Sequence, residues 1–304
     1  PAFYERDTFT SERVEVLRGS ASMLFGRGST GGADNQVSKT PRLMDENQVD
    51  LTLGSHNHVR VVGDFNQQTG ESAALRMNVM KTQADNNGSG SSLDKEGIAG
   101  AYRWGIGTRD EFEVGLYHLD VHGRPSYNHP WFTVDGKIVP KLDAQNFYGL
   151  DSDYNRGNAT YGTLSHLHRF GDGGELKTTL RHGRYQRELW ASVARFATGT
   201  TLANLNDNTV ITRASKGRIA ITDGTVLQSD YNNKFQLAGM RHNVITGLDW
   251  SQDEARRANS YADPAGVTRP TTTVGQPDAG QSITDSRAPV AFNEFTSRNQ
   301  GLYV

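Results

Sequence analysis

The sequence predicts an all-β protein of antiparallel hairpins, and three observations support this prediction. Apolar and polar residues alternate along candidate strands, as in 227–237, where Leu227, Tyr231 and Phe235 share one face. Short polar turns alternate with long loops along the chain. No run of about 20 apolar residues, the length that a membrane-spanning helix needs, occurs in the sequence. Strands are therefore expected to carry the fold.

Ten candidate strands follow from the period-two alternation and from the positions of turn residues. They cover 49–55, 59–67, 73–82, 97–106, 111–121, 160–169, 175–187, 226–237, 243–255 and a last strand that enters at Gln300. Side chains alternate across a strand, so Leu75, Met77 and Val79 are expected to oppose Arg76 and Asn78. A soluble β-sandwich has the same period, and alternation alone leaves both architectures open.

The connections between these strands are of two kinds. Tight turns of the Gly, Asp and Asn type lie in 68–71, 107–110, 171–174 and 238–241. The alternate connections are long and cover 83–96, 122–159, 190–225 and 256–299, with a short one only at His56 and Asn57. Outer-membrane barrels combine short periplasmic turns with long extracellular loops. This pattern favours a membrane barrel whose long loops face the outside of the cell.

The composition agrees with strands that cross a bilayer. Hydrophobic residues make up 35% of the chain and the mean hydropathy is -0.64, which suffices where only alternate residues face lipid. Tyr102, Trp104, Phe170 and Trp250, near strand ends, are expected to form interfacial belts. The absence of cysteine excludes disulfides and thiolate metal sites, and a net charge of -2 argues against a nucleic-acid partner.

A glycine-rich segment near the N-terminus admits two interpretations. Gly26, Gly28 and Gly31 satisfy the spacing of a dinucleotide-binding loop. That loop requires a helix directly after the glycines, and no apolar 3.6-residue period follows here. A turn between two strands is therefore the better interpretation.

Residues 12–41 join a strand of alternating charged and apolar residues to this turn and then to the run Asn-Gln-Val-Ser-Lys-Thr-Pro at 35–41. They resemble the end of the plug domain of TonB-dependent ferric siderophore receptors of the Gram-negative outer membrane. The residues that carry the resemblance are Glu12, Arg13, Arg18, Gly19, Gly26, Gly28, Gly31 and Gly32. The runs 3–9 and 29–32 are most similar to receptors for catecholate siderophores.

The resemblance implies an architecture. Residues 1–44 would be the C-terminal part of the plug, and residues 45–304 the first part of a transmembrane β-barrel, about ten antiparallel strands of a barrel of about 22. The plug part would lie inside the barrel. The chain is expected to be a fragment that lacks the segment contacting TonB.

The resemblance also implies a function. Such a receptor, located in the cell outer membrane, binds an Fe(III)–siderophore outside and imports it to the periplasm when TonB deforms the plug. Its partners would be the ferric siderophore, TonB and outer-membrane lipid; it would have no cofactor of its own, since the iron arrives as a chelate. The alternatives are an importer of haem, cobalamin or a glycan and, from another class, an outer-membrane adhesin or enzyme.

Two sets of residues are candidates for contact with a ligand. Phe3, Tyr4 and Arg6 would form the plug apex, where aromatic rings meet the chelate and arginine its negative charge. The other set is the aromatic-rich loop that holds Tyr127, Trp131 and Tyr148, which favours a recognition surface or lid. In both cases the alternative is that the side chains only pack against their neighbours.

The charges of the plug strand suggest how a plug is held. Arg13, Glu15 and Arg18 alternate with Val14 and Val16 and would face a polar lumen. An ionic seam between plug and wall would hold the plug yet let it be pulled, because polar contacts exchange readily for water.

The remaining motifs predict neither an enzyme nor a metal centre. His56-x-His58 and His166-x-His168 have the spacing of two metal ligands on one strand face, but no third ligand lies nearby in sequence. No Gly-x-Ser-x-Gly or His-Glu-x-x-His motif occurs.

Overall fold

The structure, a computed structural model, describes residues 5–19, 31–85, 90–258, 263, 265–285 and 291–304. Every regular element in these residues is a strand. None of the described residues belongs to a helix long and apolar enough to cross a membrane. The predicted all-β class is confirmed.

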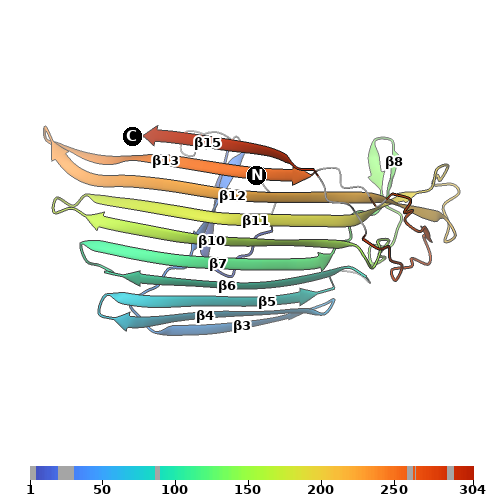
Figure 1. Cartoon of the computed structure of the whole chain (residues 1–304), viewed down its shortest axis with the longest axis horizontal. Helices are drawn as coiled ribbons and strands as arrows, with labels where there is room; N and C mark the ends of the chain where they lie inside the picture. The colour runs from blue at the N-terminus through green and yellow to red at the C-terminus, as the bar shows by residue number, and fades with distance from the viewer. Residues whose placement is uncertain (1–4, 20–30, 86–89, 259–262, 264, 286–290) are drawn as a thin grey trace.

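One antiparallel sheet makes up most of the molecule (Figure 1). Its strands, from one edge to the other, are β3 (Glu46–Gly54), β4 (His58–Gly70), β5 (Ala73–Ala84), β6 (Ser92–Trp104), β7 (Asp110–Arg124), β10 (Tyr154–Arg169), β11 (Glu175–Phe196), β12 (Val210–Leu237), β13 (Met240–Ala258) and β15 (Asn293–Tyr303). The short β14 (Thr272–Thr273) pairs with the start of β12. Two hairpins lie apart from the sheet: β1 (Ser11–Arg18) with β2 (Gly32–Ser38), and β8 (Phe132–Val134) with β9 (Lys137–Val139).

The alternation of short turns and long loops gives the sheet two different ends. The connections β4–β5, β6–β7, β10–β11 and β12–β13 are tight and lie at one end, called here the short-turn end. The connections β7–β10, β11–β12 and β13–β15 are long and lie at the other, the long-loop end (Figure 1). This asymmetry was predicted from the sequence.

Strand lengths differ from the sequence prediction mainly at the long-loop end. Residues 190–225 were predicted as one loop, but 190–196 continue β11 and 210–225 begin β12. Trp190 and Ala191 are buried there, and neighbouring residues are also covered. Because other loops cover both faces at this end, apolar and polar residues need not alternate, and the period-two pattern that identifies a half-buried strand is lost.

The sheet carries polar residues inside and apolar residues outside. In β5, Arg76, Asn78 and Thr82 are 8%, 5% and 4% exposed, whereas Met77 and Val79 are 40% and 38% exposed. The same outer face holds the exposed Leu51 and Leu116 and other large apolar side chains. This is the reverse of a soluble sandwich and matches a wall with lipid on its convex side.

A row of rings lies on the outer face near the short-turn end. Tyr102 stacks on Trp104, Trp104 on Phe112, and Phe112 on His166, with centroids 5.8, 5.3 and 4.4 Å apart. Phe170 continues the row toward Tyr231. Tyr102, Trp104 and Phe170 thus lie where an interfacial belt was expected, whereas Trp250 lies in the interior of β13.

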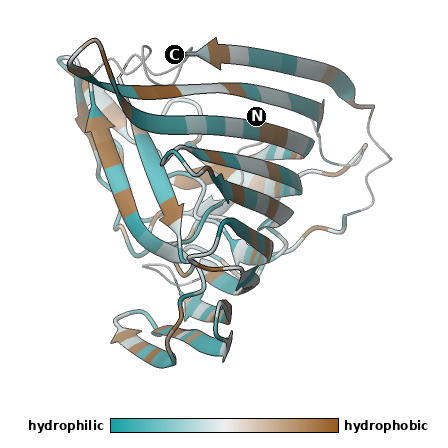
Figure 2. Cartoon of the chain, turned by 90° about the vertical axis from the view of Figure 1, so that its left-hand side faces the viewer, coloured by the Kyte–Doolittle hydropathy of each residue, from teal (hydrophilic) through white to brown (hydrophobic). Residues whose placement is uncertain are grey.

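The N-terminal segment, described here as residues 5–19 and 31–45, lies against the concave face of the sheet. Figure 2 shows the β1–β2 hairpin on the inner side of the curved wall. The strand β2 directly after Gly31 takes the place where a dinucleotide-binding loop would require a helix. The described parts of this segment therefore adopt the predicted arrangement of a plug part inside a partial barrel.

Candidate functional site

A single aromatic ring anchors the N-terminal segment to the wall. Phe9 is 3% exposed and stacks on Tyr117 at 5.6 Å, within an apolar cluster that includes Met80 and Leu119. Gly97 makes room for it, because a Cβ at this position would lie 2.7 Å from the ring. This cluster is an apolar contact between the segment and an otherwise polar concave face.

Ionic and hydrogen-bonded contacts surround this anchor. We call them the docking seam, and it comprises Asp7, Glu12, Lys39 and Arg42 of the segment with Arg60, Asp64 and Arg76 of the wall. Arg60 donates to both carboxylate oxygens of Asp7, at 2.7 and 3.2 Å, and to the Thr82 hydroxyl at 2.7 Å. The contact between Arg60 and Asp7 fixes the start of the segment to β4.

Asp64 is the centre of the docking seam. It accepts from Nε and Nη2 of Arg76 at 2.8 and 2.7 Å, and it pairs with Lys39 Nζ at 2.8 Å. Glu12 pairs with Arg42 and lies 3.6 Å from Arg76 Nη1. Segment and wall therefore share one network of alternating charges. An ionic seam was predicted, but for Arg13, Glu15 and Arg18, which are exposed and lie outside this network.

Water reaches this network. A polar cavity of about 210 Å³ is lined by Glu12, Lys39, Arg42, Asp64 and Arg76. Glu12 and Arg42 keep 32% and 45% of their side chains exposed. The pair of Glu12 and Arg42 can therefore be separated at small cost, whereas the pair of Asp64 and Arg76, 12% and 8% exposed, costs more to separate.

Backbone contacts fix the segment at the short-turn end. Asn66 accepts from the Arg42 amide and donates to the carbonyls of Arg42 and Met44, at 2.9, 2.9 and 2.5 Å. Arg76 and Arg103 donate to the carbonyls of Thr40 and Pro41. Residues 40–44 are thus held where the segment passes into β3.

The other end of the described segment lies toward the long loops. Glu5 pairs with Lys95 of β6 at 3.1 Å and accepts from Asn155 of β10 at 3.1 Å. Both partners lie near the long-loop ends of their strands. Arg6 is exposed next to this contact, whereas the candidate ligand residues Phe3 and Tyr4 lie outside the described residues.

Two glycines among the residues that carry the resemblance, Gly19 and Gly32, adopt a backbone conformation that favours glycine. Gly19 and Gly32 have φ of +92° and +142°, and a Cβ on Gly32 would lie 2.4 Å from the Leu17 carbonyl oxygen. They flank the closing end of the hairpin, where the Gly19 amide donates to the Gly31 carbonyl at 3.2 Å. Gly26 and Gly28 lie outside the described residues.

The charged residues of the motif differ in their contacts. Glu12 belongs to the docking seam, whereas Arg13 pairs with Glu15 on an exposed strand face. Arg18 is exposed at the end of β1. Among the ion pairs of the described residues, Glu12 is the charge of this set that contacts the wall, through Arg76.

A second assembly closes the long-loop end, and we call it the loop cap. It comprises residues 142–153, 263 and 265–283 with the end of β11 and the start of β12. Its apolar core joins Tyr148, Ala194 and Ile211, each at most 2% exposed. The Tyr148 hydroxyl donates to the Val274 carbonyl at 3.0 Å, and burial raises the pKa of this phenol.

These contacts correct one of the predicted ligand residues. Tyr148 is 1% exposed and serves to pack the loops, so it is withdrawn from the candidate set. Tyr127 and Trp131, from the same loop, are 42% and 51% exposed and remain available to a ligand. The loop therefore contains both a packing part and an exposed part, and sequence alone did not separate them.

Buried charges hold the loop cap together. Arg269 is 2% exposed; its Nη1 lies 3.0 Å from Asp153, and its Nε lies 2.7 Å from Asp263. Asp153 also accepts from the amides of Leu150 and Ser192, at 3.0 and 2.9 Å. The network joins three segments distant in sequence.

This network lowers the pKa of the Asp263 carboxyl. Burial raises its pKa, but hydrogen bonds from Arg269, Ser215 and Trp190 act against burial and hold the pKa below its usual value. Asp263 is therefore ionised at neutral pH, which its role as acceptor for three donors requires.

Known proteins similar to this chain are siderophore receptors and TonB-dependent receptors. The catecholate siderophore receptor Fiu of Escherichia coli K12 is 26% identical over 288 residues, which cover 90% of this chain and 37% of that protein. The probable TonB-dependent receptor BfrD of Bordetella pertussis is 26% identical over 308 residues, 98% of this chain and 41% of that protein. No family model matches the chain. The resemblance noted in the sequence is confirmed by these relatives.

Solved structures with a similar fold include one of the same receptors. The crystal structure of the E. coli ferric-catecholate import receptor Fiu in its closed form superimposes with a TM-score of 0.81 at 23% identity, over 97% of this chain and 42% of that one. The chain thus spans about two-fifths of the length of the proteins that it matches. This similarity supports the interpretation of the open sheet as part of a receptor barrel.

Proposed function

We propose that this chain, similar over nine-tenths of its length to TonB-dependent siderophore receptors, is part of an outer-membrane receptor that binds a ferric siderophore outside the cell and imports it into the periplasm. The likeness to a catecholate receptor favours a catecholate-type chelate over haem, cobalamin or a glycan. The relatives are receptors by name, which favours transport over an adhesin or enzyme role.

One observation carries the proposal. The N-terminal segment crosses the polar concave face from Lys95 and Asn155 near the long loops to Asn66 near the short turns. A segment in this position blocks the space that the wall encloses and presents residues 5 and 6 toward the long loops. We assign residues 1–44 to the plug and residues 45–304 to the barrel wall.

The docking seam supports coupling to TonB. Force applied to the plug must separate it from the wall without unfolding the wall. The seam consists of charged pairs with an exposed edge at Glu12 and Arg42, and Phe9 is the apolar anchor. We infer that displacement of this segment opens a polar path along Asp64, Arg76 and Asn78.

The proposed ligand contacts lie at the long-loop end. Arg6 supplies a cation for an anionic ferric chelate, and Phe3 and Tyr4 precede it in the chain. Tyr127 and Trp131 supply exposed rings from the loop. The receptor needs no cofactor for this role, because the iron is carried within the chelate.

Uptake measurements test the proposal. Cells that depend on the full-length receptor are grown under iron limitation and given a radiolabelled ferric catecholate siderophore. Uptake is expected with TonB present, and binding without uptake is expected in a strain that lacks TonB. Uptake that does not depend on TonB, or the absence of ferric siderophore binding, would contradict the proposal.

Binding to isolated outer membranes tests the apex. Arg6→Ala is expected to weaken binding by roughly ten- to hundredfold, the value of a charge-assisted hydrogen bond of about 1.5–3 kcal/mol. Arg109→Ala removes another exposed cation, at the short-turn end, and is the matched control. Equal affinities of the two variants, at equal receptor levels, would move recognition to Tyr127 and Trp131.

A further inference from the structure

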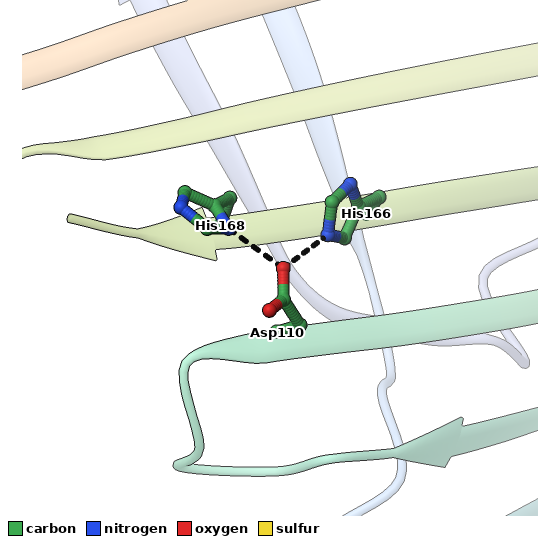
Figure 3. A group of neighbouring side chains, drawn as sticks. All are labelled: Asp110, His166 and His168. Atoms are coloured by element: carbon green, nitrogen blue, oxygen red, sulfur yellow. Dashed lines mark hydrogen bonds and ion pairs between the residues drawn. The ribbon is translucent and has the colours of Figure 1, made fainter.

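Two imidazoles and a carboxylate meet on the outer face of the sheet, away from the docking seam and the loop cap. Asp110 is the first residue of β7, and His166 and His168 lie near the end of β10. Cα pairing sets Asp110 opposite His168 and Phe112 opposite His166. The cluster therefore lies at the short-turn end, and its members belong to two neighbouring strands (Figure 3).

Their polar atoms converge on one point. The same oxygen of Asp110, Oδ1, lies 2.9 Å from His166 Nε2 and 2.7 Å from His168 Nδ1 (Figure 3). One ligand atom from each of the three residues lies within 4.8 Å of the others. The sequence offered only the histidine pair; the strand register supplies the third group from a position 56 residues away.

Aromatic neighbours hold both imidazoles. Phe112 stacks on His166 with centroids 4.4 Å apart and an interplanar angle of 6°, and Phe170 meets His168 edge-on at 4.6 Å. These contacts restrict the rings to orientations in which both nitrogens face Asp110. A site whose ligands are already oriented loses less conformational entropy when an ion binds.

The charge of the cluster favours a cation. Among the described residues, Asp110 has ion-pair contacts only with these two histidines. The nearby Arg169 is directed to Glu111 and Glu175 instead, at 3.1 Å each. The cluster with neutral imidazoles therefore carries one uncompensated negative charge.

We propose that Asp110, His166 and His168 form a binding site for a divalent late first-row transition metal, with Zn²⁺ as the expected ion. Imidazole nitrogen and carboxylate oxygen are ligands that Zn²⁺ takes at about 2.0–2.2 Å. Ligands at such distances in tetrahedral geometry lie roughly 3.4 Å apart, so the carboxylate must withdraw by roughly half an ångström from each ring. A side-chain rotation of Asp110 provides this movement.

Metal binding displaces the imidazole protons that face Asp110, and no further reactant is needed to accept them. In the hydrogen-bonded cluster each imidazole donates its proton to the carboxylate, which only accepts. When the ion takes the place of these protons, each proton moves through solvent to the other nitrogen of the same ring. The three side chains are 44%, 41% and 21% exposed and lie where β7 begins and β10 ends, at the edge of the lipid-facing zone. The ion can therefore enter from the water at this edge, and water completes its coordination.

The site is independent of siderophore transport and has a structural consequence. A bound ion would join the start of β7 to the end of β10 at the short-turn end, beside the aromatic row. It would stabilise these strand ends in proportion to its occupancy.

Titration of the purified receptor tests the site. The tag-free, full-length receptor in detergent is stripped with chelator and titrated calorimetrically with Zn²⁺. One site is expected, and His166→Gln and His168→Gln should each weaken it by at least about tenfold. Asp110→Asn should also weaken it. His182→Gln, which alters an imidazole of β11 that contacts Thr225 of β12, is the matched control and should leave the affinity unchanged.

Electron paramagnetic resonance of bound Cu²⁺ identifies the ligands directly. Two coupled nitrogens are expected in the wild-type receptor and one in either histidine variant. Zn²⁺ affinity that neither histidine variant changes, or no stoichiometric Zn²⁺ binding, would overturn the proposal. The wild-type spectrum tests the site even if a variant does not fold. A wild-type spectrum without coupling to two nitrogens would show that the site is absent.

Discussion

The docking seam and the loop cap both rest on pairs between arginine and carboxylate, but they differ in their access to water. In the seam, the side chains of Arg42 and Glu12 keep 45% and 32% of their surface exposed and line a polar cavity, whereas Arg76 and Asp64 at the centre keep 8% and 12%. In the cap, Arg269 and Asp153 keep 2% and 1%. The seam therefore has an edge at which water can replace the partners, and the pair of Arg269 and Asp153 has none.

This difference matches the two roles proposed for the regions. A segment that must leave the wall is best held by contacts whose loss costs little once water enters, with a small apolar anchor such as Phe9. A rim that receives a ligand from outside is best held rigid, and a buried ion pair is costly to break because it leaves a charge unpaired. The comparison therefore yields opposite expectations for the two regions.

The largest effect is expected in the loop cap. Arg269→Met removes a buried cation and leaves Asp153 and Asp263 without it, which should cost about 3–5 kcal/mol of the cap's stability. Limited proteolysis of residues 266–281 in the full-length receptor measures the loss. Arg241→Met, at an exposed position, is the control. Equal resistance of both variants would show that the cap does not depend on its ion pair.

The next effect concerns the apolar anchor. Phe9→Ala removes a ring that is buried against Tyr117 and should weaken docking of the N-terminal segment by about 3 kcal/mol, the low end for such a change in a core. Amide exchange in β2 reports the loss, while exchange in β11 should not change. Exchange that rises equally in both strands would mean that segment and wall unfold together.

A smaller effect is expected for the centre of the docking seam. Asp64→Asn keeps the shape of the side chain but removes the charge that Lys39 and Arg76 share. Because the pair is buried but a polar cavity adjoins it and Arg76 keeps Glu12 nearby, the loss should be about 1.5–3 kcal/mol, below that of Arg269→Met. The same exchange measurement applies. A loss as large as in the cap would contradict the proposed difference between the two regions.

The smallest effect concerns the stability of the loop cap in acid. The pKa of Asp263 is lowered in the folded protein, so its contribution is complete above the ordinary pKa of an aspartate, about 3.9, and is lost as the pH falls through the folded-state value. Protease resistance of the cap, measured with an acid-tolerant protease, should fall in this window below about pH 4. Asp263→Asn should flatten the response, and an unchanged response would assign it to other carboxyls.

Much of the wall could be predicted from the sequence, because its two faces differ in polarity. Where one face is apolar and the other polar, residues must alternate, and Met77 and Val79 were correctly placed opposite Arg76 and Asn78. Above that zone, loops cover both faces of β11 and β12, and the rule no longer applies. The ends of these strands were therefore mistaken for a loop.

The site was predictable only in part. The resemblance identified the segment, but it placed the ionic contact at Arg13, Glu15 and Arg18 instead of Asp7 and Lys39. The partners Arg60 and Asp64 depend on where the segment crosses the wall. The buried network of Arg269 joins residues more than 70 positions apart, and no local pattern marks it. Asp110 could have been found only from the register that sets it opposite His168.

Native-state hydrogen exchange of the full-length receptor in rising concentrations of urea tests the central claim most directly, namely that the segment is detachable and the cap is fixed. Amides of β2 should lose protection at a lower urea concentration than amides of residues 190–196 in the loop cap, while the interior strands of the wall remain protected. Loss of protection in the cap first, or in both regions at the same concentration, would contradict the account.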